Sequence, residues 1–277
     1  MNETLKRTLS GLVYIILLLV CISYSSLSFF VLFGIFLLFA VIEFCNLLNF
    51  NKIIPILISV IVYSSVCYLS LKNIELNKSF DFSILIATLL ISVKCIVFLY
   101  DKSINKVDAV SKYLFLFGYL ILPFVILTKI PFGIRGYNSK IIIGIFILIW
   151  TNDTFAYIVG KSIGKHKLFE SISPKKTIEG FFGGFIFAIL ASYLISKYYI
   201  EGSVTNQYIW IVFAVIVSIF GTIGDLIESK FKRLANVKDS GKIMPGHGGI
   251  LDRLDSVIFV SPFVFLFYQI LNYVTFS

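Results

Sequence analysis

Nine long apolar runs place the strongest constraint on how this chain can fold. A helix needs about 20 mostly apolar residues to cross a bilayer, and continuous runs favour helices over the alternating strands of a membrane barrel. The sequence therefore predicts an all-α, polytopic integral membrane bundle of about nine transmembrane helices. The runs lie at 9–24, 27–49, 53–71, 80–100, 113–129, 140–159, 179–199, 207–228 and 252–274.

Composition excludes the usual soluble classes. Hydrophobic residues make up 58% and charged residues 14% of the 277 residues. A soluble domain carries about 25% charged residues. Such a chain cannot cover its surface with polar groups, which excludes a cytosolic enzyme, a disordered tail and a secreted disulfide scaffold. The four cysteines lie in apolar runs without a CxxC motif or a nearby histidine, so we do not expect them to bind metal.

The chain is predicted to form one membrane-embedded domain over residues 1–277. Its N-terminal helices, 1–129, carry no motif, whereas 140–277 holds the C-terminal helices and loops that carry the motifs. The first apolar run follows two basic residues, as in a secretory signal, but no small-residue cleavage site follows, so we expect an uncleaved span. Glu43 and Lys94 lie within spans and have no motif around them. We expect these two to form structural pairs or to lie at helix ends.

Basic residues are distributed unequally between the two sides of the predicted bundle. The N-terminus and the even-numbered connections carry seventeen of the 24 Lys and Arg residues. The positive-inside rule places this side in the cytoplasm. We therefore expect a protein of the inner (cell) membrane, with its N-terminus inside and its C-terminus outside. The seventeen are Lys6, Arg7, Lys52, Lys102, Lys106, Lys112, Lys161, Lys165, Lys167, Lys175, Lys176, Lys230, Lys232, Arg233, Lys238, Lys242 and Arg253.

Two of these connections, 160–178 and 229–253, hold eleven of the seventeen basic residues together with both histidines and several glycines. Topology alone explains a few basic residues per loop but not this crowding. Lysines neutralise phosphate charge, glycines let backbone N–H groups approach oxygen atoms, and nearby carboxylates hold divalent metals. The pattern indicates phosphate chemistry at the cytoplasmic edge of the bundle.

The helix before the second connection carries a polar face. If it continues, Asp225, Ser229 and Lys232 share one face, with Glu228 beside them. A buried aspartate near a membrane surface is costly unless it is paired or bound to metal. The plainer alternative is that Asp225 pairs with a lysine and only ends the helix.

Residues 245–249, Pro-Gly-His-Gly-Gly, are incompatible with a helix and predict a tight loop. Asp252 and Asp255 then lie three apart on the first turns of the last helix. There they either attract a metal or complement the helix dipole. His247 is either a donor to a ligand or a turn residue.

The first connection contains an intramembrane charge and a basic strip. Asp153 lies within a span, where a lone charge indicates function by default. Lys175, Lys176 and Thr177 precede the next helix and predict an anion site at its N-terminus. The alternative is that these lysines bind anionic lipid headgroups.

The segment SKFKRLANVKDSGKIMPGHGGILDRLD, at 229–255, strongly resembles the signature of the phosphatidate cytidylyltransferase (CDP-diacylglycerol synthase) family. The segment at 152–180 and GDLIES at 224–229 are similar to upstream blocks of that family. The nine-span plan of its bacterial members extends the resemblance to the whole chain. Lys161, where arginine is commoner, and the stretch 169–171 depart from the pattern. The matching signature positions are Ser229, Lys232, Arg233, Lys238, Asp239, Pro245, His247, Gly248, Gly249, Asp252, Arg253 and Asp255.

The resemblance implies an enzyme that converts CTP and phosphatidate into CDP-diacylglycerol and pyrophosphate. It also implies a homodimer in membrane lipid, without a nucleic-acid partner. Mg²⁺ is the implied cofactor, held by Asp225 and Asp252, and a monovalent cation such as K⁺ shares the site in some relatives. The residues expected to be catalytic are Asp225, Asp252, Asp255 and Lys232, and those expected to bind substrate are Lys175, Lys176, Thr177, Ser229, Arg233, Lys238, His247, Gly248 and Asp153.

Two other functions fit parts of the pattern. A CDP-alcohol phosphotransferase is also membrane-embedded and metal-dependent, but it needs an aspartate-rich DGxxAR helix that this chain lacks. A cation transporter with Asp153 and Asp225 as ligands predicts polar residues in both leaflets. Here the polar residues collect at one edge of the predicted bundle.

Overall fold

The computed structural model describes residues 3–72, 78–101, 107–133, 136–200 and 207–276. Within these residues, nine helices are long and apolar enough to cross a membrane, which confirms the predicted all-α bundle. The first two spans are separated at Ser25, whose hydroxyl accepts a hydrogen bond from the Ser28 N–H at 3.1 Å and caps the second helix. The division between these two spans is thus set by a local capping box.

The chain order of the elements is simple. The first half holds α1 (Glu3–Tyr24), α2 (Ser26–Leu47), α3 (Ile53–Leu71), α4 (Lys78–Tyr100), α5 (Ala109–Phe115), the π-helical turn η1 (Leu116–Ile121) and α6 (Leu122–Lys129). The second half holds β1 (Phe132–Gly133), β2 (Gly136–Tyr137), α7 (Ser139–Ile163), β3 (Lys167–Phe169), β4 (Ser173–Thr177), α8 (Ile178–Leu194), the π-helical turn η2 (Ile195–Tyr199), α9 (Gln207–Leu234) and α10 (Leu251–Phe276).

Two short antiparallel hairpins accompany the helices. β1 pairs with β2, and β3 pairs with β4 in a register that places Lys167 opposite Thr177. The second hairpin lies in the connection predicted as a basic strip, so Lys175 and Lys176 belong to a strand that ends where α8 begins. Helical periodicity does not reveal so short a hairpin.

The fifth span changes its winding in the middle. Pro123 is at the start of α6 and has no N–H to donate to the preceding turn, and that turn is η1, which is π-helical. The Pro123 carbonyl oxygen also has a partner in another helix, because Ser261 Oγ of α10 donates to it at 3.0 Å. This polar contact ties the middle of the fifth span to the last helix.

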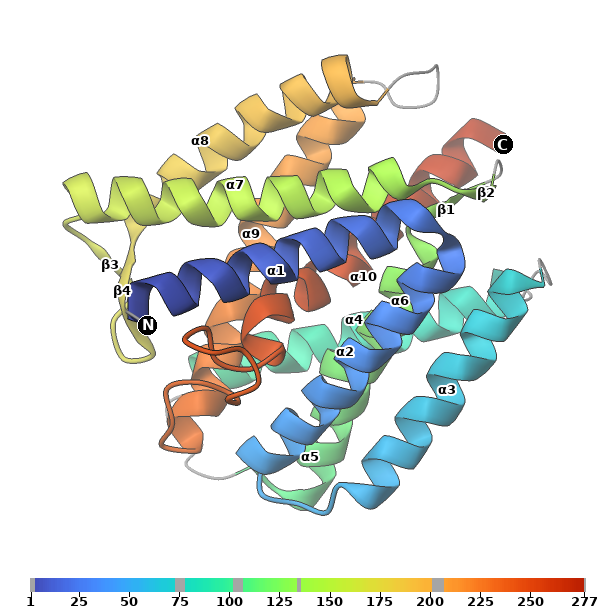
Figure 1. Ribbon diagram of the computed structural model, residues 1–277, viewed down its shortest axis with the longest axis horizontal. Coiled ribbons are helices and arrows are strands. Elements are labelled where there is room, and N and C mark those ends of the chain that lie inside the picture. The colour runs from blue at the N-terminus through green and yellow to red at the C-terminus, as the bar shows by residue number, and fades with distance from the viewer. Residues whose placement is uncertain (1–2, 73–77, 102–106, 134–135, 201–206, 277) are drawn as a thin grey trace.

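The N-terminus and the β3–β4 hairpin lie at one end of the molecule, and the C-terminus lies at the other end beside β1 and β2 (Figure 1). The loop that joins α9 to α10 lies at the same end as the N-terminus. The two polar connections singled out from the sequence therefore come together in space.

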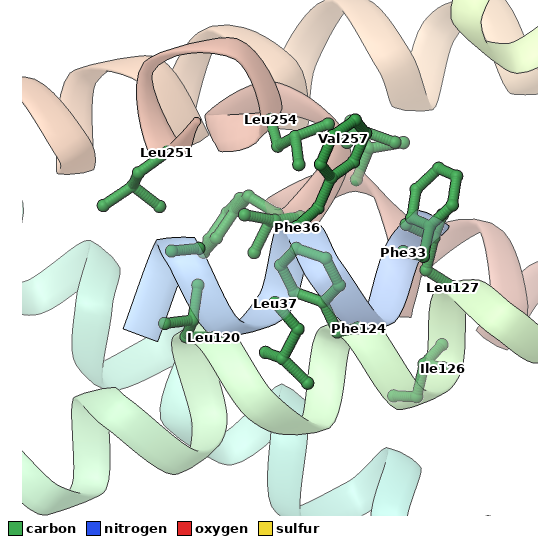
Figure 2. Packing of buried hydrophobic residues seen from close by; sticks show 14 of the residues in the cluster. Phe33, Phe36, Leu37, Leu120, Phe124, Ile126, Leu127, Leu251, Leu254 and Val257 are labelled. Carbon is green, nitrogen blue, oxygen red and sulfur yellow. The ribbon is translucent and has the colours of Figure 1, made fainter. Parts of the chain in front are cut away.

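The core joins the two halves of the chain. Side chains of α2, η1, α6 and α10 interlock there (Figure 2). Phe231 of α9 is fully buried and lies among aromatic rings of the first half, with centroids 4.9 Å from Phe98 and 5.2 Å from Phe44. The motif-free helices thus fix the position of the end of α9 that carries Phe231 and of the helix α10 that packs beside it. The residues labelled in the close view are Phe33, Phe36, Leu37, Leu120, Phe124, Ile126, Leu127, Leu251, Leu254 and Val257.

A buried lysine next to Phe231 closes the end of another helix. Lys230 Nζ donates to the carbonyl oxygens of Phe98 and Leu99, and to that of Asp101 at 2.6 Å. These carbonyls belong to the last turn of α4 and the residue after it, where a helix has no internal donors left. A cation also complements the negative end of the helix dipole there.

We expect Lys230→Met to lower the free energy of unfolding by about 1–3 kcal/mol, because it leaves buried carbonyl oxygens without a donor. The same replacement at the exposed Lys52, which makes no side-chain cap, is expected to change it by less than about 0.5 kcal/mol. Thermal unfolding of the two purified variants in detergent measures the difference. Equal midpoints would show that the lysine cap contributes nothing.

Candidate active site

Three carboxylates meet where α9 packs against α10. Asp225 and Glu228 of α9 and Asp255 of α10 each offer an oxygen atom within 4.8 Å of the others. Close approach of the helices is possible because Gly224 has no side chain, and a Cβ there would lie 2.8 Å from the Asp255 carbonyl oxygen. Asp225 and Asp255 are half-buried, whereas Glu228 is fully buried and forms the floor of this carboxylate cluster.

Two lysines neutralise part of this charge. Lys176 Nζ, from β4, lies 2.6 Å from Asp225 Oδ2. Lys232 Nζ forms an ion pair with Glu228 and lies 2.7 Å from Asp252 Oδ1. The structure therefore brings both polar connections to one site. Lys176 pairs with Asp225, and Lys232 pairs with Glu228 and Asp252. Asp225 does pair with a lysine, as the plainer interpretation required, but that lysine comes from another connection.

The predicted polar face of α9 is present. Ser229 Oγ donates to Asp225 Oδ1 at 3.2 Å, and Lys232 lies one turn further on the same side. Asp153 of α7 is exposed and interacts electrostatically with Asp225. It receives a long hydrogen bond of 3.4 Å from the side chain of Asn152.

Asp252 organises the loop that precedes α10. Its Oδ2 accepts hydrogen bonds from the Ser240 N–H at 2.8 Å, the Ser240 hydroxyl at 2.9 Å and the Gly249 N–H at 2.7 Å. Its Oδ1 accepts from Lys232. Asp252 thus reaches the carboxylate cluster through Lys232, and its own oxygens are engaged with the loop.

Gly248 is required by both its backbone and its surroundings. Its φ is +88°, and a Cβ there would lie 2.4 Å from Asp252 Oδ2. Residues 245–249 do form the tight loop predicted from Pro-Gly-His-Gly-Gly, closed by an isolated bridge between Met244 and Gly248. Because Gly248 has no side chain, the Asp252 carboxylate can pack directly against the backbone of this loop.

His247 faces the first helix of the chain. Its Nδ1 lies 2.8 Å from Ser10 Oγ, and the same hydroxyl lies 2.9 Å from the Pro245 carbonyl oxygen. Burial lowers the pKa of His247, and the positive charges of Arg253 and Arg7 lower it further. The imidazole is therefore mostly neutral at pH 7, where it acts as a hydrogen-bonding group.

The remaining predicted substrate-binding residues have different settings. Thr177 is buried, and its hydroxyl caps α8 by accepting from the Gly180 N–H at 3.1 Å. Arg233 Nε donates to the Ile172 carbonyl oxygen at 3.2 Å, which links α9 to the β3–β4 hairpin. Lys175 and Lys238 are exposed. Of the predicted cations, Lys176 and Lys232 therefore lie within reach of the carboxylate cluster.

Sequence reasoning missed the place of Glu43. This residue of α2 is 2% exposed and accepts hydrogen bonds from the N-terminus of α10 and from Ser240. It neither lies at a helix end nor forms an ion pair with any described residue. A lone acidic residue in a buried span was the signal that could have found it. Lys94, by contrast, makes a structural contact, since its Nζ donates to Ser111 Oγ at 2.9 Å.

The carboxylate cluster fits a divalent cation. Glu228 Oε1 is buried and receives no hydrogen bond from any described residue, although buried acceptors normally have a donor. Oxygen atoms of carboxylates are the ligands that Mg²⁺ prefers. The residues placed to hold such an ion are Asp225, Glu228 and Asp255. Asp252, which the resemblance implied as a ligand, lies next to them with Lys232 between.

Comparison with known sequences adds to this geometry. A model of the family described as "Cytidylyltransferase family" matches residues 5–271. Three proteins named phosphatidate cytidylyltransferase are similar to this chain. Those of Staphylococcus epidermidis and Staphylococcus aureus are 48% identical over 128 residues and 51% identical over 130 residues, each covering 46% of this chain and 48% of the relative. That of Staphylococcus haemolyticus is 47% identical over 131 residues, or 47% of this chain and 50% of the relative. The chain thus matches about half the length of these relatives.

We expect Gly248→Ala to lower the thermal midpoint more than Gly136→Ala does. Both glycines have nearly the same positive φ, +88° and +86°, so both variants carry a backbone cost of about 1–2 kcal/mol. A Cβ at Gly136 meets nothing within 4 Å, whereas one at Gly248 displaces Asp252. Thermal unfolding in detergent compares them. If the two midpoints fall equally, Asp252 does not lie against this glycine.

Proposed function

Because the chain belongs to the cytidylyltransferase family, we propose that it transfers CMP from CTP to phosphatidate, with CDP-diacylglycerol and pyrophosphate as products. The observation that carries this proposal is the site where α9 and α10 meet, with three carboxylates and two lysines at the end of a bundle of membrane-spanning helices. The names of the staphylococcal relatives support the choice of substrates.

The reaction calls for charge neutralisation more than for proton transfer. The attacking group is the phosphate monoester of phosphatidate, whose second pKa is about 6, so it is largely dianionic at pH 7. One of its oxygens forms a bond to the α-phosphorus of CTP, and the bond from that phosphorus to the bridging oxygen breaks. The electron pair leaves with pyrophosphate. The main barrier is repulsion between two anions, and positioning and electrostatics reduce it.

The lysines of the site are placed for that task. Lys176 and Lys232 now pair with Asp225, Glu228 and Asp252. Phosphate oxygens are competing acceptors, and both ammonium groups can turn toward them over a short distance. Lys176 lies on the more open side, with 26% of its side chain exposed, so it contacts the incoming substrate. Lys232 is 12% exposed and holds the floor of the site.

A bound Mg²⁺ would offset the charge of the phosphates and polarise the attacked phosphorus. Asp225, Glu228 and Asp255 would hold it, with Asp252 beside them, and a monovalent cation such as K⁺ would share the same group of oxygens. Without a cation, five acidic side chains, Asp153 included, are offset in part by Lys176 and Lys232, and by the charge of Arg253 acting on Asp153.

The placement of the site explains the apolar body of the protein. The acyl chains of phosphatidate stay in the bilayer while its phosphate reaches the ends of the helices, where CTP arrives from water. The N-terminus, the β3–β4 hairpin and the loop that joins α9 to α10 lie at one end of the molecule (Figure 1). The two connections that hold these elements are rich in basic residues, so we place this end in the cytoplasm. The protein acts in the inner membrane as a homodimer, as the resemblance implies.

We expect purified protein to incorporate radiolabelled CTP into chloroform-extractable lipid only when phosphatidate and Mg²⁺ are both present. Asp225→Asn, Asp255→Asn and Asp252→Asn are each expected to lower kcat by about a hundredfold or more, because charge stabilisation is the main source of catalysis. The measurement is the initial rate of label transfer, with and without K⁺.

The matched control is Asp108→Asn. Asp108 is an exposed N-cap of α5, and asparagine caps a helix about as well as aspartate. We expect its rate to equal that of the unaltered protein. Full activity in Asp225→Asn would remove the carboxylate cluster from the mechanism. A protein that moves cations but transfers no label would be a transporter, and the proposed function would be wrong.

A further inference from the structure

We infer that Glu43 is a positioning residue for CMP transfer, although it lies in α2, outside every segment that carries a motif. The inference rests on the proposed function and deepens it, because it assigns a role to the motif-free half of the chain. Glu43 does not belong to the carboxylate cluster and is 2% exposed, so it touches no substrate. Its effect passes through the loop that begins α10.

The contacts of Glu43 are directed at one short stretch of backbone. Its Oε1 accepts from the Ile250 N–H at 3.0 Å, and its Oε2 accepts from the Leu251 N–H at 2.8 Å. These are free N–H groups at the start of α10, where a helix has no internal acceptors for them and its dipole is positive. A carboxylate from α2 thus serves as the cap that α10 does not supply for itself.

The same carboxylate is linked to Asp252 through one hydroxyl group. Ser240 Oγ lies 3.0 Å from Glu43 Oε2 and 2.9 Å from Asp252 Oδ2. Asp252 in turn holds the Ser240 and Gly249 N–H groups and Lys232. Glu43 and Asp252 therefore both hold the loop before α10. Asp252 is in turn paired with Lys232, which also pairs with Glu228 of the carboxylate cluster.

The Glu43 carboxylate packs against two glycines of the loop, where there is no room for a side chain. A Cβ at Gly249 would lie 2.4 Å from Glu43 Oε2, and one at Gly241 would lie 2.4 Å from Glu43 Oε1. The signature glycine at 249 is thus explained by a side chain more than two hundred residues earlier in the sequence. Any larger residue at either glycine would push the carboxylate away from the N-terminus of α10.

The chemistry of these contacts requires a carboxylate of this length. Each oxygen of Glu43 accepts from one backbone N–H group, and the Ser240 hydroxyl shares its single proton between Glu43 and Asp252. Glutamine has the same shape but replaces one oxygen with an NH₂ group, which would face a backbone N–H. Aspartate keeps both acceptors but is shorter by one methylene. The two substitutions therefore separate the loss of an acceptor from the loss of reach.

The test compares Glu43→Gln with unaltered protein by two readouts. Hydrogen exchange followed by mass spectrometry is expected to show faster exchange in peptides covering 240–251. Label transfer from CTP is expected to show kcat lowered by about tenfold or more, with the KM for phosphatidate within about twofold, because the displaced groups act on the transferring phosphate. Glu43→Asp is expected to fall between the two proteins in both readouts, and it serves if the glutamine variant does not fold.

Tyr63→Phe is the matched control for general loosening. Tyr63 of α3 donates to the Phe30 carbonyl oxygen of α2 at 2.9 Å and is buried, but it is remote from the loop. Its loss should lower thermal stability and leave both the kcat and the exchange of 240–251 unchanged. If Tyr63→Phe lowers kcat as much as Glu43→Gln, or if Glu43→Gln leaves exchange and kcat unchanged, Glu43 is not a positioning residue.

The two proposals fail in distinguishable ways. An unaltered protein that transfers no CMP would overturn the proposed function. The exchange measurement does not use CTP or phosphatidate, so it still decides whether Glu43 holds the loop. Faster exchange in Glu43→Gln with an unchanged kcat would retain the contact but overturn its part in the reaction.

Discussion

Charged groups buried among membrane-spanning helices must find their polar partners inside the protein, because lipid offers none. In this protein, two buried charged side chains find their hydrogen-bond partners at the ends of neighbouring helices. Glu43 takes the free N–H groups where α10 begins, and Lys230 takes the free carbonyls where α4 ends. Each charge has the sign opposite to the helix pole that it meets. These two contacts tie α2 to α10 and α9 to α4, and the site lies between them.

Much of the fold could be predicted from the sequence, because apolar length is a local property. The nine runs, the tight loop at 245–249 and the shared face of Asp225 and Ser229 all follow from neighbouring residues, and the structure confirms them. The partners of Glu43 could not be predicted in this way. They are backbone N–H groups of residues 250 and 251, and no periodicity connects these residues to residue 43.

The candidate site could be predicted in part for the same reason. Resemblance to a family marked Asp225, Asp252 and Asp255, but it did not reveal which oxygens are free. Glu228 was noted only as a neighbour on α9, yet it forms the buried floor of the carboxylate cluster. Lys176 reaches Asp225 because the β3–β4 hairpin folds back toward α9, and a hairpin this short leaves no signal in hydropathy.

The contact between Ser10 and His247 joins the first span to the loop just before the last one. Spans enter the membrane in the order of their synthesis, so α1 is in place long before its partner loop exists. The loop at 240–250 can make its contacts with α10 only after α10, the last helix, has been synthesised. A truncated or stalled product therefore holds most of the bundle and still lacks Asp255, the carboxylate that α10 contributes to the cluster.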